Sequence, residues 1–409
     1  MLIAIVVGAA AGLAANAFGA GAPWLDWTIA NLAQPVGQIF LRLLFMLVVP
    51  VLFSALVVGV AGLELGDLGR MGMRMLGYTV VVSTMAVAIG MALVNVVGPG
   101  RGAPESLLAL ARQGTAVKPT GAAFSLVGIV PANPVKAAAD GDMIGLIFFS
   151  LLFGVGIALV RSEATERLRQ AIEGLYEVSM RLIALVLKVA PVGVAALLFS
   201  MTARLGADVL RQLAAYVGVV LGGLALQMGV VYSLSVRFAG GMSPVEFFRG
   251  SRVAMVTAFS TASSSATLPT ALRVAEEELR LPPAVARFVL TAGSAMNQNG
   301  TALFEGVTVL FLAQLFGVPL DLGQQAGVMG ICILAGIGTA GVPAGSIPVV
   351  AMILQTYGIP LEGLGLILGV DRFLDMARTT VNVTGDLAAA VFVARGERVA
   401  PGAGPSPAP

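Results

Sequence analysis

The sequence predicts an all-α integral membrane protein. Of its 409 residues, 57% are hydrophobic and only 11% are charged, and the mean hydropathy is +0.94. Soluble domains carry about 25% charged residues, whereas a helix that spans a bilayer needs about 20 mainly apolar residues. Several stretches of the chain reach that length, so the composition excludes a soluble globular protein.

The residue types that are missing narrow the chemistry. The chain has no histidine and a single cysteine, Cys332, which we expect to be a buried small apolar residue. Histidine-based metal sites, histidine-containing triads and internal disulfides are therefore excluded. The net charge of +2 is too small to imply a nucleic-acid partner, and we expect no organic cofactor. Carboxylates, amides, hydroxyls and backbone carbonyls remain to bind protons or cations.

The first half of the chain contains six apolar spans. The first twenty residues lack the positive leader of a signal peptide and are followed at once by further apolar sequence, so we interpret them as a span. The polar, Gly- and Pro-rich stretch 99–119 is expected to be a loop. The spans cover residues 1–20, about 34–63, about 75–97, 143–160 after a break at 131–142, about 180–203 and about 210–236.

Positive charge predicts the orientation. Arg70 and Arg74 lie between the second and third spans, and Arg161, Arg167 and Arg169 lie between the fourth and fifth. The link between the first two spans has no Lys or Arg. The positive-inside rule then places both termini in the cytoplasm. The tail, 397–409, is expected to be disordered.

Two later apolar stretches are interrupted at their centres. Residues 258–269 read AFSTASSSATLP and residues 336–348 read GIGTAGVPAGSIP, and neither centre favours a continuous helix. Irregular backbone at membrane depth is tolerated only where protein covers it or a cavity adjoins it. We therefore expect two re-entrant hairpins that meet at a midplane binding site, with a kinked span as the alternative. With a seventh and a last span, the pattern gives eight transmembrane helices and two hairpins.

The last span carries a polar stripe. Asp371, Asp375, Arg378, Asn382 and Asp386 follow one another at intervals of 4, 3, 4 and 4 residues, which places them on one helical face. Ionisable residues inside a membrane mark substrate or ion pathways. The guanidinium suits a carboxylate, Asp375 suits an ammonium group, and the oxygens of Asn382 and Asp386 suit a small cation such as sodium. The alternative is a structural helix in which Asp375 and Arg378 neutralise each other.

The seventh span is polar at its centre. Asn297 and Asn299 precede Gly300 and Thr301 within SAMNQNGTALFEG, which indicates locally unwound helix whose carbonyls are free to coordinate. Glu305 follows in apolar sequence. Because burial favours the neutral form of a carboxylate, Glu305 is a candidate proton carrier. The alternative is a glutamate at the lipid interface or in an ion pair.

Four motifs in this order resemble the dicarboxylate/amino acid:cation symporters, a family that includes the glutamate transporters. They are SSSATLP, the N-x-x-G-T of the seventh span, GTAGVPAG and DRFLDMARTTVNVTGD, and the similarity covers nearly the whole chain. The resemblance implies inverted repeats, a homotrimer in the cell (inner) membrane and an elevator mechanism. It also implies a scaffold of residues 1–66 and 101–204 and a moving transport domain of residues 67–100 and 205–396.

The resemblance also implies roles for single residues. Arg378 matches the arginine that binds the substrate side-chain carboxylate, and Asp375 matches the aspartate that binds the amino group. Four-carbon dicarboxylate carriers of the family lack this aspartate and neutral amino acid carriers lack the arginine, so the substrate is expected to be aspartate or glutamate. Further expected substrate contacts are Ser264, Ser265, Thr301, Thr379, Asn382 and the backbone near Val342.

Cation coupling departs from the sodium-driven pattern of the family. The resemblance implies that one sodium site is preserved, whereas a second keeps Thr339 but has Gln298 in place of methionine. The third has Asn299 in place of an aspartate, and its span-three ligands align with Thr79 and Val82, leaving only Ser83. The first tip has Ala262 where some relatives have an arginine. The preserved site comprises Gly293, Asn297, Asn382 and Asp386.

The expected function is therefore symport of acidic amino acids. Because Glu305 matches the proton-carrying glutamate of proton-coupled members, we expect proton coupling with one residual sodium site possible. The alternative is a sodium-coupled carrier with fewer sodium sites, and a more distant one is a passive anion channel. An intramembrane enzyme is disfavoured, because the hydroxyls at the first tip have no histidine as a general base.

Overall fold

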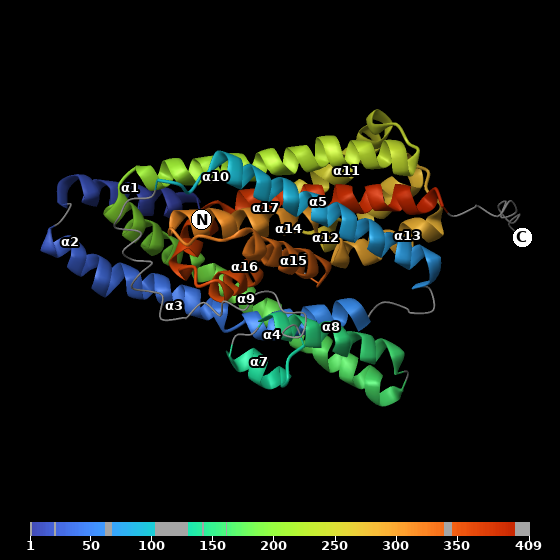
Figure 1. Cartoon of the computed structure of the whole chain (residues 1–409), viewed down its shortest axis with the longest axis horizontal. Helices are drawn as coiled ribbons and strands as arrows, with labels where there is room; N and C mark the ends of the chain where they lie inside the picture. Colours follow the sequence, from blue (N-terminus) through green and yellow to red (C-terminus); the bar gives the residue numbers. More distant parts are fainter. Residues whose placement is uncertain are drawn as a thin grey trace, which may run out of the picture.

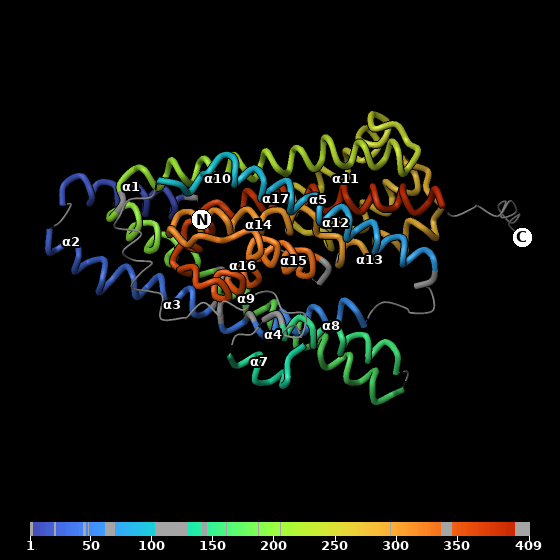
Figure 2. Tube along the Cα trace, in the orientation of Figure 1, coloured from blue at the N-terminus to red at the C-terminus, as the bar shows by residue number. Residues whose placement is uncertain are grey.

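The computed structural model describes residues 2–19, 22–61, 68–102, 130–140, 143–160, 162–338 and 346–396. In these segments the regular structure is helical and contains no β-strand, as the sequence predicts. The helices form an elongated bundle in which the last helix, α17 (Leu364–Ala394), runs along the long axis through the interior (Figure 1). The tube in Figure 2 shows α1 and α2 at one end of this axis and α13 toward the other.

The N-terminal helices gather around one very long helix. This helix, α9 (Glu163–Leu205), packs against α1 (Leu2–Gly19), α3 (Gln34–Phe45) and α4 (Val48–Ala61). Between α1 and α3 the chain forms α2 (Pro23–Thr28) and a π-helical turn, Ile29–Ala33. The short α7 (Pro134–Asp140) packs on α8 (Met143–Leu159), which in turn packs against α4.

The remaining helices surround α17. Its neighbours include α10, α11, α13 and α14 and also α9 of the N-terminal group, and α14 packs against α5. The hairpin helices α15 and α16 contact α14, and they also reach α4 of the N-terminal group. The bounds are α5 (Met73–Val97), α10 (Asp208–Leu226), α11 (Pro244–Thr261), α12 (Ser264–Arg273), α13 (Pro283–Met296), α14 (Asn299–Leu315), α15 (Leu322–Gly338) and α16 (Ser346–Thr356).

Two described helical segments are long and apolar enough to cross a bilayer. They are Arg70–Val97, with 28 residues, and Asp208–Gly240, with 33 residues. A third candidate joins Glu163–Val186 to Lys188–Arg204 across a bend of 52°. Five other apolar helices have only 10–17 residues each. The total of eight spans therefore remains a prediction.

Three boundaries differ from the sequence expectation. Helix α9 begins at Glu163, well before the expected start near residue 180, because its polar first half forms helix-stabilising ion pairs such as Arg167–Glu163 and Arg169–Glu166. The expected second span is interrupted by a turn after Phe45. The break expected at 131–142 contains the short helix α7.

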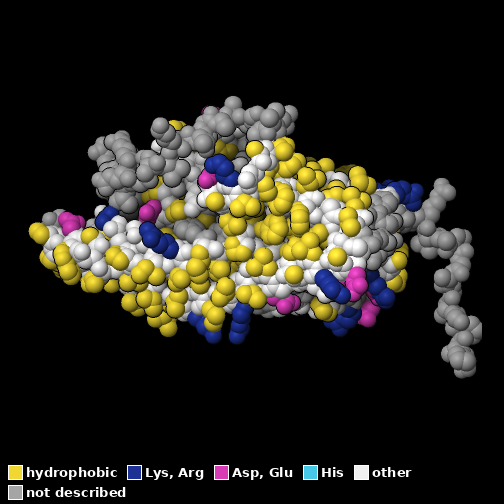
Figure 3. Space-filling model, turned by 90° about the horizontal axis from the view of Figure 1, so that it is seen from below, with side chains coloured by type: hydrophobic (Ala, Val, Ile, Leu, Met, Phe, Trp, Pro, Cys, Tyr) yellow, Lys and Arg dark blue, Asp and Glu magenta, His cyan; other side chains and the backbone are white. Residues whose placement is uncertain are grey.

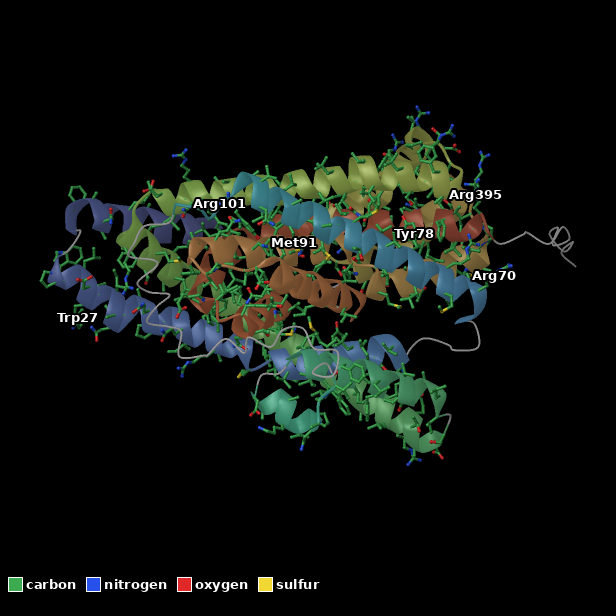
Figure 4. The ribbon with its side chains drawn as sticks, in the orientation of Figure 1. Trp27, Arg70, Tyr78, Met91, Arg101 and Arg395 are labelled. Carbon is green, nitrogen blue, oxygen red and sulfur yellow. The ribbon has the colours of Figure 1, made fainter. Side chains whose placement is uncertain are left out.

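The surface combines apolar cover with charged ends. Figure 3 shows hydrophobic side chains spread over the viewed face, with charged side chains in a few small groups. In Figure 4, Arg70 and Arg395 lie toward one end of the long axis, whereas Trp27 lies at the other. This distribution suits helices that cross an apolar layer with their charged residues outside it.

Candidate functional site

The helix break in the seventh span lies at the centre of the site. Helix α13 ends at Met296 and α14 begins at Asn299, so Asn297 and Gln298 are not helical, with ψ angles of 61° and 56°. This confirms the predicted unwound segment. The Gln298 amide donates 3.3 Å to the carbonyl of Gly336, near the end of α15. The second hairpin therefore lies directly against the break.

Asn382 of α17 ties the break to the last helix. Its Oδ1 accepts hydrogen bonds from the backbone amides of Gly300 and Thr301, at 2.7 and 3.3 Å. Its Nδ2 donates to Gln298 Oε1 at 2.6 Å and to Thr301 Oγ1 at 2.9 Å. One buried amide thus satisfies the first free amides of α14. Gly300 is required here, because a Cβ would lie 2.7 Å from the carbonyl oxygen of Arg378.

Arg378 lies one turn earlier on α17 and is buried among acidic and aromatic groups. Its Nε and Nη2 both lie 2.9 Å from Asp375 Oδ1, and its Nη1 lies 3.1 Å from Asp371 Oδ1. The guanidinium carbon lies 4.2 Å from the centre of the Phe304 ring. Only 2% of the Arg378 side chain is exposed. Nη1 meets Asp371 as an ion pair but makes no well-aligned hydrogen bond within the described residues, so this nitrogen keeps donor capacity for a ligand.

Asp386 lies two turns beyond Arg378 and faces the other side of the break. Its Oδ1 accepts 2.9 Å from Asn297 Nδ2, and a Cβ on Gly293 would lie 2.7 Å from the same oxygen. Asn297 Oδ1 is buried and has no hydrogen-bond partner in the described part of the chain. The four residues of the expected sodium site, Gly293, Asn297, Asn382 and Asp386, are therefore linked through this break, and their carboxylate and amide oxygens fit a hard cation.

Glu305 lies inside the bundle on α14. Its side chain is fully buried, and neither carboxyl oxygen has a hydrogen-bond partner among the described residues. The preceding residue, Phe304, is the one that covers the Arg378 guanidinium. A buried carboxyl group without a partner is costly when charged, so its position suits a group that is neutral for part of a cycle.

Asn299 joins four helical segments through neutral hydrogen bonds. Its Oδ1 accepts 2.6 Å from Ser83 Oγ on α5, and its Nδ2 donates 3.2 Å to the Tyr232 hydroxyl. That hydroxyl donates 3.0 Å to the carbonyl of Val381 on α17. Both functional atoms of the Asn299 amide are thus occupied by protein groups. The nearby Thr79 hydroxyl is buried without a hydrogen-bond partner in the described residues.

The non-helical tip of the first hairpin is shorter than the sequence suggests. Helix α11 ends before Ala262, which has φ = 50°, and Ser263 caps α12 by accepting 3.2 Å from the Ala266 amide. Only these two residues interrupt the helices, because α12 continues through Pro269. Ser264 is buried and its hydroxyl has no hydrogen-bond partner in the described residues, whereas Ser265 is exposed.

The other expected contacts have different outcomes. Thr379 is buried on α17 beside Arg378. Thr339 and Val342 lie outside the described residues, so their roles remain predictions. Cys332 is buried, as expected.

Two groups at the site had no assigned role in the sequence. Asp371 belongs to the polar stripe, but only the structure shows that it shares the Arg378 guanidinium with Asp375. Phe304 gives no signal in the sequence, because an aromatic residue in an apolar helix is usually core. Its neighbour Glu305 is the only local hint.

The fold and site describe a helical membrane protein with a buried, charged binding centre at a helix break. The model of the sodium:dicarboxylate symporter family matches residues 1–396. The chain is 36% identical to the proton/glutamate-aspartate symporter of Escherichia coli over 91% of this chain and 87% of that protein. It is 34% identical to the proton/sodium-glutamate symport protein of Bacillus subtilis, over 89% and 86%. It is also 30% identical to mouse excitatory amino acid transporter 4, over 87% and 76%.

The chain belongs to the sodium:dicarboxylate symporter family. The family and the two bacterial relatives are symporters, and the mouse relative is a transporter, which makes the protein a membrane transporter and not an enzyme. The family resemblance seen in the sequence motifs is thereby confirmed.

Proposed function

We propose that the protein is a secondary symporter of glutamate or aspartate. The observation that carries this proposal is the buried Arg378 guanidinium, which has acidic partners on the preceding turns and lies one turn from the helix break. The names of the bacterial relatives, which are glutamate and aspartate symporters, agree with it.

In the proposed binding mode, the charged groups of the ligand replace the contact between Arg378 and Asp375. The ligand side-chain carboxylate takes the guanidinium of Arg378, and its ammonium group takes Asp375. Asp371 stays on the guanidinium and Phe304 covers its face. Thr301, Thr379, Asn382, Ser264, Ser265 and the backbone near Val342 complete the proposed contacts.

Proton coupling is the favoured mode. An acidic amino acid adds a net negative charge to a buried site that already contains carboxylates, so a positive charge must accompany it. Glu305 is buried beside the aromatic ring on Arg378 and has no hydrogen-bond partner in the described residues, which suits a proton carrier. A proton on Glu305 would remove one negative charge from the site during transport.

Sodium coupling is the second candidate, and one observation favours it. Asn297 Oδ1 is a buried acceptor that no described group satisfies, and its amide nitrogen already bonds Asp386. A cation held by Gly293, Asn297, Asn382 and Asp386 would satisfy that oxygen. We propose no cation at Asn299, because its amide is occupied by hydrogen bonds to Ser83 and Tyr232 and the network contains no carboxylate.

The transport cycle is proposed to follow the family's elevator mechanism. Residues 67–100 and 205–396 would move against a scaffold of residues 1–66 and 101–204, in a homotrimer with eight spans and two hairpins. The packing of the N-terminal helices on α9, and of the later helices on α17, supports this division. The shared location of Arg70 and Arg395 supports a C-terminus on the cytoplasmic side, and the proposed location is the inner membrane (Figure 4).

Uptake into proteoliposomes tests the proposed function. Purified protein should accumulate L-aspartate or L-glutamate against a gradient when only an inward proton gradient is imposed. Uptake that needs sodium and ignores pH would select the sodium alternative. Current that does not depend on substrate and is unaffected by changing Arg378 would indicate a passive channel instead.

A further inference from the structure

The only two tryptophans of the chain lie close together on the short helix α2. Trp24 and Trp27 are three residues apart, so they share one face of the helix. Their exposed fractions are 54% and 59%. The opposite face is buried, because Leu25 and Ile29 pack with Ala203 of α9 in a small core of their own. Both indole rings are therefore about half exposed, on a helix whose other face is packed.

An uncharged apolar stripe continues from the tryptophans along the outside of the π-helical turn Ile29–Ala33 and of α3. Leu32, Val36 and Ile39 are 54%, 40% and 60% exposed. From Trp27 to Leu41 the sequence contains no charged residue, whereas Asp26 lies exposed between the two tryptophans. Along the chain, the order is thus two indoles with an acidic group between them, followed by a long apolar face.

The immediate surroundings of α2 fix its orientation. A Cβ on Gly19 would lie 2.4 Å from the Trp24 ring, so this ring lies directly across the end of α1. Thr28 and Asn31 donate to the carbonyls of Trp24 and Trp27, at 2.8 and 2.9 Å. No hydrogen bond from either indole N–H to the described part of the chain is found, so both donors remain available to an outside partner.

The tryptophans lie at the molecular end opposite Arg70 and Arg395, and Arg204, which follows Ala203 on α9, is a basic residue near them. Figure 4 shows Trp27 at one extreme of the long axis and Arg70 and Arg395 toward the opposite one. Phe18, the residue before the end of α1, is 90% exposed in the same part of the chain. In Figure 3, hydrophobic side chains lie at this end together with a few acidic and basic ones.

We propose that Trp24 and Trp27 anchor this end of the protein in the interfacial layer of the bilayer. An indole ring is apolar with one polar N–H, which suits the boundary between lipid headgroups and acyl chains. The N–H groups would donate to lipid ester or phosphate oxygens, Asp26 would face water, and the stripe along α3 would face acyl chains. Through the core of Leu25, Ile29 and Ala203, the anchor would fix the depth of α9. The proposal depends on membrane insertion and not on the substrate.

Tryptophan fluorescence tests the anchor directly, because all tryptophan emission arises from α2. The full-length protein is reconstituted in phosphatidylcholine vesicles that carry bromine either near the headgroup or near the acyl methyl end. The shallow label should reduce emission more than the deep label, and aqueous iodide should reduce it less than for free tryptophan. The proposal would be overturned if iodide quenched the protein as strongly as it quenches free tryptophan, or if the deep label quenched more than the shallow one.

Single variants separate the two rings and test a competing occupant. Trp24→Phe and Trp27→Phe each leave one reporter, and both should keep the preference for the shallow label. If a second copy of the chain covered the indoles, neither brominated lipid would quench them, and placing single protomers in nanodiscs would restore quenching. That result would also overturn the proposal. Retained substrate uptake by both variants confirms that they fold.

Discussion

Replacing Asn382 with alanine should weaken substrate binding strongly by releasing the helix break. The wild-type amide makes four hydrogen bonds between 2.6 and 3.3 Å to Gln298, Gly300 and Thr301. Each buried hydrogen bond contributes roughly 1 kcal/mol net, and an orphaned buried amide costs about 1–3 kcal/mol. Discounting the long contact, the segment should lose about 3 kcal/mol of stabilisation.

This loss can be measured as a change in affinity. If the ligand binds only the ordered break, about 3 kcal/mol corresponds to an affinity lower by on the order of a hundredfold. Calorimetric titration of L-aspartate into the purified variant measures this. Thr380→Ala is the matched control, because in the described part of the chain the Thr380 hydroxyl donates only to the Met376 carbonyl of its own helix. Unchanged aspartate affinity in Asn382→Ala would refute the role given to this amide.

Three further predictions concern the charged groups and the proposed cation site. Glu305→Gln should abolish the pH dependence of aspartate uptake but preserve exchange, and unchanged pH dependence would reject Glu305 as the proton carrier. Asp371→Asn should lower aspartate affinity by about tenfold, because a charge-assisted contact at 3.1 Å becomes a neutral one, with a loss of roughly 1–2 kcal/mol; equal binding by the variant would show that Asp375 alone orients Arg378. Gly293→Ala should remove any sodium stimulation of uptake, because the added methyl would lie 2.7 Å from Asp386 Oδ1; stimulation that persists would locate the cation elsewhere.

The parts of the fold that depend on local chemistry were predictable from the sequence. The polar stripe on the last helix and the break at Asn297 follow from spacing and residue type, and the structure contains both. The start of α9 was not predictable from hydropathy, because its first half is polar and is stabilised by ion pairs within the helix. Hydropathy detects burial in lipid, whereas a helix can extend well beyond it.

The partners within the site needed the three-dimensional structure. Phe304 on Arg378 and Ser83 on Asn299 are contacts between helices distant in sequence, and no spacing rule connects them. Asp371 was visible as part of the stripe, but its ion pair depends on the rotamer of Arg378. The sequence therefore predicts which residues are polar and buried, but not which partners they contact.

The most direct measurement of the central claim is L-aspartate accumulation by an Arg378→Gln variant in proteoliposomes. Glutamine keeps a donor at this position but removes the charge and the two-pronged geometry, so accumulation of aspartate and glutamate should be lost. An unchanged circular dichroism spectrum and an unchanged melting profile would show that the variant is folded. Normal accumulation of labelled aspartate by this folded variant would contradict the proposed binding mode.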